Sequence, residues 1–89
     1  MRARRLTVVD EYAADGRTAV FSEQGMVVVL SELATVAWSV LGEDWTPVEV
    51  VAEALVVEFG APPGEGAALA ATEEALRTLA EHALVELDS

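Results

Sequence analysis

The side chains that could do acid–base chemistry are few in this chain of 89 residues, which has no cysteine and a single histidine, His82. A histidine that acts as a general base needs an orienting partner and a pocket. Its neighbour Glu81 is one residue away, and residues one apart do not share a helix face. We interpret His82 as a partly exposed residue near a helix end, where the helix dipole favours it. The sequence therefore predicts no catalytic residue and no enzyme.

The paired carboxylates are better explained as solvated surface than as a metal site. Glu49 and Glu53 are four residues apart, without a histidine to join them. Glu73 and Glu74 precede Arg77 by four and three residues, which is the spacing of ordinary ion pairs on a helix. The segment GAPPGEG (60–66) contains three glycines but no lysine, and no strand precedes it, so it does not predict a phosphate-binding loop. We expect neither a metal nor a cofactor.

The charge balance argues against a polyanionic partner. The chain has five arginines, no lysine and sixteen acids, for a net charge of −11. Proteins that bind DNA usually neutralise several phosphates with basic side chains, and an anionic membrane surface selects for the same residues. No apolar run reaches the roughly 20 residues of a membrane span, and the N-terminal residues lack the apolar stretch of a signal peptide. We therefore expect a cytoplasmic protein that binds neither nucleic acid nor membrane.

The first third of the chain predicts an antiparallel meander. Three short runs rich in β-branched residues cover 6–12, 17–21 and 26–30. Asp15-Gly16 is a turn dipeptide between the first two runs, and the loop 22–25 separates the second from the third. The tail 84–87 is a short apolar run that we expect to pack against the core.

The remainder predicts three helices. Ser31 is a candidate N-cap for the first, and the TPVE segment (46–49) has the capping residue, the proline and the glutamate of a second helix start. Gly60 follows the apolar stripe of that helix and marks its end; the stripe consists of Val48, Val51, Ala52, Leu55 and Phe59. A third, Ala-rich helix extends to about Ala83. Together the pattern predicts one α+β domain over 1–89, in the order β-β-β-α-α-α, with strands within about 6–30 and helices within about 32–83.

Three aromatic residues occupy the helical part. Trp38 and Phe59 lie beside apolar positions of the first and second helices, so we expect both in the core. Trp45 precedes the second helix, and the pattern leaves open whether it covers the core or forms an exposed contact.

The third strand has an unguarded edge. In a meander of three strands the first and last are edges, with unpaired N–H and C=O groups. Residues Met26, Val27, Val28, Val29 and Leu30 carry no charge, proline or glycine that would protect such an edge. One face of the strand must pack on the helices, and the edge could accept an extended peptide as a further strand. The alternative is that the third helix or a second copy of the chain covers it.

The segment VVVLSELATVAWSVLGEDWTPVEVVAEALVVEFG (27–60) resembles the small PqqD-like proteins, which include the recognition elements of ribosomal peptide pathways. The matching positions are Leu30-Ser31, Trp38, Val40-Leu41, the TPVE helix start, and Leu79 with Ala83-Leu84. In two of them this chain departs from the family pattern: Ser31 stands where Asn is usual and Ala83 where Gly is usual. The resemblance extends over about residues 5 to 87.

This resemblance implies a winged helix-turn-helix-like fold without a DNA-binding role. It also implies that the leader of a precursor peptide binds as an antiparallel strand on the third strand, in a groove shared with the third helix. Carried over to this chain, the backbone of Val27, Val28, Val29 and Leu30 binds the peptide. The third-helix candidates for the groove are Leu69, Glu73, Leu76, Arg77 and Ala80.

A stand-alone domain of this composition further resembles the recognition proteins of lasso-peptide pathways. The implied partners are then a precursor peptide, a leader peptidase and a macrocyclase. Two alternatives remain from the residues alone: a winged-helix transcription regulator, and a structural dimerisation module that hides its third strand against its own copy.

Overall fold

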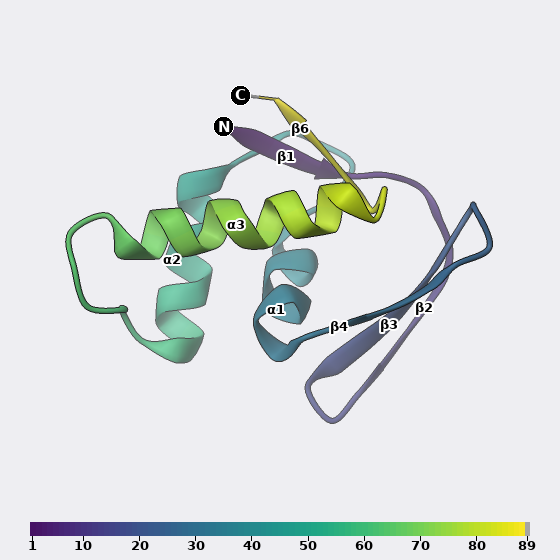
Figure 1. Ribbon diagram of the computed structural model, residues 1–89, viewed down its shortest axis with the longest axis horizontal. Helices are drawn as coiled ribbons and strands as arrows, with labels where there is room; N and C mark the ends of the chain where they lie inside the picture. The colour runs from purple at the N-terminus through teal and green to yellow at the C-terminus, as the bar shows by residue number, and fades with distance from the viewer. Residues whose placement is uncertain (89) are drawn as a thin grey trace.

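The computed structural model describes residues 1–88, and residues 8–30 form the meander that the sequence predicts (Figure 1). Strands β2 (Val8–Ala14), β3 (Arg17–Ser22) and β4 (Val27–Leu30) lie in the order β2-β3-β4, and both pairs are antiparallel. Asp15 and Gly16 both have positive φ, 53° and 76°, as a two-residue type I′ turn requires. This turn fixes the register of β2 on β3 and places β4 at the opposite edge of the sheet.

Three helices follow, as expected: α1 (Glu32–Val40), α2 (Val48–Phe59) and α3 (Ala67–Glu81). Ser31 is the N-cap of α1, because its hydroxyl oxygen accepts a hydrogen bond from the Ala34 N–H at 3.1 Å. Gly60 ends α2 with a φ of 83°. The α+β class and the order of meander and helices are therefore confirmed. None of the helices in residues 1–88 is long and apolar enough to cross a membrane.

A second antiparallel sheet corrects the predicted strand count and the predicted strand range. Its order is β5-β1-β6, with β1 at Arg2–Arg5, β5 at Thr46–Pro47 and β6 at Val85–Asp88. The tail predicted as apolar packing is thus a strand, and Figure 1 shows it beside the N-terminal strand. Directly opposite residues form ion pairs across the two strands, Arg2 with Asp88 and Arg4 with Glu86.

The predicted capping box of α2 is absent, because its first two residues belong to β5. Pro47 is the N-cap, and no side chain caps the helix. Pairing with β1 holds Thr46 in an extended conformation, so its hydroxyl does not reach the helix and lies 3.4 Å from the Asp44 carbonyl instead. The Val48 N–H has no partner within the helix, because it lies in the first turn. It donates a hydrogen bond to the Met1 carbonyl at 3.0 Å instead.

The core lies where the three helices meet the inner faces of both sheets. Trp38 is buried as expected, and so are Val48, Val51, Ala52 and Leu55 of the predicted stripe. The remaining members of the buried apolar cluster come from β1, β3, β4, α1, α3 and the C-terminal segment: Ala3, Val20, Leu30, Ala37, Leu41, Leu76, Leu79, Leu84 and Val85. Phe59 is the exception to the prediction: it is 48% exposed, because the last turn of α2 extends beyond the core.

Arg5 connects the end of β1 to the end of α1. Its Nε and one terminal nitrogen donate to the Trp38 carbonyl at 3.0 and 2.6 Å, and its guanidinium carbon lies 4.1 Å from the centroid of the Trp38 ring. Glu11 pairs with Arg5 at 3.3 Å and accepts from the Trp38 indole N–H at 2.9 Å. Burial lowers the pKa of Arg5, and the nearby Glu11 carboxylate opposes this by raising it. The resemblance singled out Trp38, and this network fixes its position.

Candidate peptide-binding edge

Strand β4 has a free edge among the residues that the structure describes. It pairs only with β3, and no described segment pairs with its other side. One face packs inward, as expected, and the side chains alternate between this face and the exposed one. Val27 and Val29 are 58% and 66% exposed, whereas Leu30 is 3% exposed and Val28 packs against the core. One face of β4 is thus committed to the core, and its edge and other face are open.

The register shows which backbone groups point outward. The Ser22 N–H donates to the Met26 carbonyl at 2.8 Å, so Met26 belongs to a hydrogen-bonded pair. Such pairs recur at every second residue of an antiparallel ladder, and Val28 opposite Val20 and Leu30 opposite Thr18 are the next two. The N–H and C=O groups of Val27 and Val29 therefore point away from β3 and lie on the free edge.

The outer face of the meander exposes several apolar side chains beside the charged Asp10 and Arg17. Tyr12 on β2, Phe21 on β3 and Val29 on β4 are 68%, 38% and 66% exposed. They lie on one face, because Ala19 is the cross-strand neighbour of both Tyr12 and Val29 and side chains two residues apart share a face. A strand added to β4 would extend this apolar face as well as the hydrogen-bond ladder.

The candidate residues of α3 have different surroundings. Leu76 is completely buried, so it packs beneath the surface and offers no contact area in this state. Glu73 and Arg77 form an ion pair at 3.5 Å, with the Arg77 side chain 59% exposed. Leu69 and Ala80 are half-buried and pack against the core cluster.

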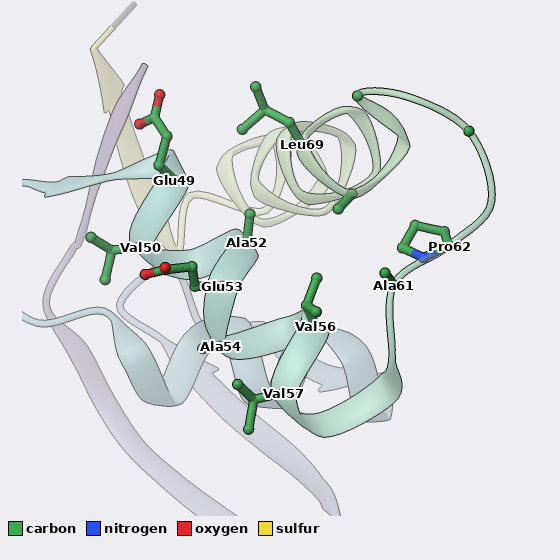
Figure 2. A pocket seen from close by; sticks show the side chains of 13 residues that line it. Glu49, Val50, Ala52, Glu53, Ala54, Val56, Val57, Ala61, Pro62 and Leu69 are labelled. Atoms are coloured by element: carbon green, nitrogen blue, oxygen red, sulfur yellow. The ribbon is translucent and has the colours of Figure 1, made fainter.

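Two hollows show how α3 is oriented. Leu69 lines an open hollow of about 940 Å³ together with Glu49 and Ala52 of α2 (Figure 2). Ala71 and Thr72 line a second hollow, of about 240 Å³, that also includes Leu33 of α1. Neither contains a residue of β4.

Leu33 is three residues beyond the end of β4, and α1 contacts both β4 and α3. The flank of α3 toward the start of α1 is therefore the one that carries Ala71 and, by the helical repeat, Ala75 and Thr78. The candidates Leu69, Glu73 and Ala80 recur on the opposite flank, toward the start of α2. The sequence did not distinguish these flanks, because both border the same buried stripe.

The residues considered as candidates for catalysis or metal binding lie on different elements. His82 is the exposed C-cap residue of α3, and Glu49 and Glu53 lie on α2. Within residues 1–88 no three histidine, aspartate or glutamate side chains converge as metal ligands would. Trp45, which the sequence left open, lies half-buried under the guanidinium groups of Arg2 and Arg4, at 5.2 and 4.5 Å from its ring centroid. It therefore supports the β1–β6 sheet.

The fold resembles a solved structure described as TbiB1 in complex with the TbiA(beta) leader peptide. The TM-score is 0.78 at 20% sequence identity, over 97% of this chain and 98% of that chain. This likeness establishes the fold along nearly the whole length. Neither the protein-family models nor the curated proteins contain a match.

Proposed function

We propose that this protein is a non-catalytic recognition protein, which binds the leader segment of a ribosomally made precursor peptide as an antiparallel strand on β4. It then presents the precursor to a leader peptidase or macrocyclase of the same pathway. The observation that carries the proposal is the free edge of β4, where Val27 and Val29 direct their backbone groups away from β3. The described complex of TbiB1, which has the same fold, contains a leader peptide.

The four residues of β4 divide into two roles in this proposal. Val27 and Val29 offer two N–H and two C=O groups to the guest strand, and their exposed side chains meet its outward side chains. Val28 and Leu30 hold the strand on β3 and on the core. The groove then continues to α3, where the predicted set of Leu69, Glu73, Leu76, Arg77 and Ala80 and the flank of Ala71, Ala75 and Thr78 are the two competing assignments.

A proline exchange at two adjacent positions tests strand addition. Val29→Pro removes an N–H that faces the free edge, and proline is tolerated there because no ladder bond is lost. We expect the variant to keep its circular dichroism spectrum and to bind the leader at least about tenfold more weakly, since one backbone bond is lost and its neighbours are displaced. The probe is a fluorescently labelled synthetic leader peptide of a candidate precursor, and its binding is measured by fluorescence polarisation.

The matched control is Val28→Pro, which removes an N–H directed at β3. It should lower the midpoint of urea unfolding, because it breaks the β3–β4 ladder. A folded Val29→Pro variant with unchanged affinity would contradict strand addition to β4. Light scattering with and without the leader separates a second outcome: a stable dimer that does not bind the leader would mean that the edge is covered by another copy of the chain.

The same titration assigns the flank of α3. Thr78→Arg places a bulky charge on the flank toward α1, and Glu73→Arg places the same side chain on the flank toward α2. Both native side chains reach the surface, so the fold should tolerate either change. The variant that weakens leader binding identifies the flank that lines the groove.

A further inference from the structure

The solvent side of α2 carries a row of apolar side chains beside the acids Glu49 and Glu53, where a solvated helix is usually polar throughout (Figure 2). Val57 is 84% exposed and Val50 is 46% exposed, and together with Ala54 they recur at the i, i+4 and i+7 positions of one helix face. The opposite face of α2 is buried in the core through Val48, Val51 and Leu55. Valine is a poor residue for an exposed helix position, so this second apolar face indicates a contact surface.

A hollow gives this surface a shape. It has a volume of about 940 Å³ and lies between α2, the connection over residues 60–66 and the first turn of α3. Figure 2 shows Ala52 and Val56 on the side of α2 toward Pro62, with Leu69 of α3 above them. No residue of β4 lines it, so the hollow and the free edge are separate surfaces.

The charged residues that line the hollow, and those of the chain segment around α2, are all acidic. Residues 42–66 contain six acids and no arginine, lysine or histidine. Two of these acids, Glu49 and Glu53, line the hollow itself, and among the ion pairs of residues 1–88 none involves an acid of this segment. The six acids are Glu43, Asp44, Glu49, Glu53, Glu58 and Glu65. An occupant must therefore bring positive charge to the rim.

The walls of the hollow also limit the backbone conformation of the occupant. They are formed by helices and a loop, without a strand edge, and the backbone groups of α2 are already paired within the helix. An occupant must then satisfy its own backbone hydrogen bonds, as an amphipathic helix does. The exposed face from Val50 to Val57 matches about two helical turns.

We propose that this surface, formed by α2 and the 60–66 connection, docks an amphipathic helix of a second protein, with an apolar face and a rim of lysine or arginine. A second copy of this chain does not fit, because each copy would bring the same acidic rim and a net charge of −11. The protein would thus hold an extended peptide on β4 and a basic helix on α2 at the same time. This goes beyond leader binding and does not depend on it.

A model peptide tests the proposal on the full chain. The probe is a helical peptide of about 18 residues, long enough to be helical in isolation, with leucine on one face and lysine on the other. We expect saturable binding, with shifts in the amide NMR spectrum concentrated on α2 and residues 60–66. Replacing Glu49 and Glu53 together by glutamine should weaken binding about tenfold, and Val57→Ser should weaken it by a similar factor.

Two controls make the test specific. Glu23→Gln with Glu81→Gln removes the same charge at exposed positions outside the hollow, and it should change the affinity less than about twofold. Equal weakening by both pairs, or shifts spread over the whole surface, would show diffuse attraction to an acidic protein and overturn the proposal. All these variants should keep their affinity for the leader, so failure here leaves strand addition to β4 standing.

Discussion

Ala83 holds a left-handed backbone conformation after the end of α3, with a φ of 58°. The Ala83 N–H donates to the Ala80 carbonyl and the Leu84 N–H to the Leu79 carbonyl, both at 3.0 Å. This is the pair of bonds of a Schellman motif, in which glycine is the preferred residue at the position of Ala83. The PqqD-like proteins that the sequence resembles have glycine at this place, and alanine here leaves the turn intact but makes it less favourable.

Ala83→Gly should stabilise the protein, because a Cβ in the left-handed region costs about 1–2 kcal/mol and the added freedom of the unfolded glycine offsets only part of this. We expect a gain of about 0.5–1 kcal/mol in the free energy of unfolding, measured with urea. Ala75→Gly, in the interior of α3, is the control and should lose about 1 kcal/mol. A loss at both positions would mean that residue 83 is not left-handed in solution.

At the scale of one element, the hydrogen-bonding pattern of β4 predicts which of its amides exchange slowly, and this can be tested without a ligand. The amides of Val28 and Leu30 face β3, whereas those of Val27 and Val29 face the free edge. We expect hydrogen exchange followed by NMR to be slow at Val28 and Leu30 and fast at Val27 and Val29, since only bonded amides are protected. Added leader should protect Val27 and Val29 as well. Slow exchange at all four residues without the leader would mean that the edge is already covered.

The meander and the helices could be predicted because local chemistry specifies them. Asp15-Gly16 sets the hairpin and Ser31 caps α1. The strand β1 could not be predicted, because RARR has three charged residues among four and becomes a strand only through partners more than forty residues away. The same pairing with β1 keeps Thr46 extended, so it does not form the capping box that its local sequence predicts.

The free edge of β4 was also predicted only in part. An apolar run without gatekeeping residues is visible in the sequence, and it identified the correct strand as an edge. Which of its residues face outward depends on the register against β3, and this register follows from the Ser22–Met26 contact. The flank of α3 depends on how the helix is rotated over α1, which the repeat of apolar residues alone does not specify.

At the scale of the whole molecule, four of the five arginines are engaged in contacts within the fold, which leaves little positive charge for a polyanion. Arg2, Arg4 and Arg5 are engaged with acids and with the two tryptophans, and Arg77 pairs with Glu73. A winged-helix regulator would need a basic reading helix, and α3 presents two further exposed acids, Glu74 and Glu81, around that single pair. The charge distribution disfavours DNA recognition.

Net charge should also govern stability. The molecule measures 39 × 30 × 18 Å, so at about 0.01 M salt, where the Debye length is roughly 30 Å, nearly all of its charges interact. The exposed ion pairs contribute about 0–1 kcal/mol each, whereas the excess of sixteen acids over five arginines causes repulsion throughout the fold. Raising NaCl to about 0.15 M shortens the Debye length to roughly 8 Å and weakens the long-range repulsion more than the short contacts.

We therefore expect this addition of salt to raise the Tm by about 5 °C, which for a domain of this size corresponds to about 1 kcal/mol. Differential scanning calorimetry measures the effect. A variant with Glu43, Glu49, Glu53 and Glu58 changed to glutamine is the control: it should start from a higher Tm at low salt and gain less from added NaCl, because part of the repulsion is already removed. A Tm that falls with salt would instead mean that the arginine pairs of the β1–β6 sheet outweigh the repulsion among the acids.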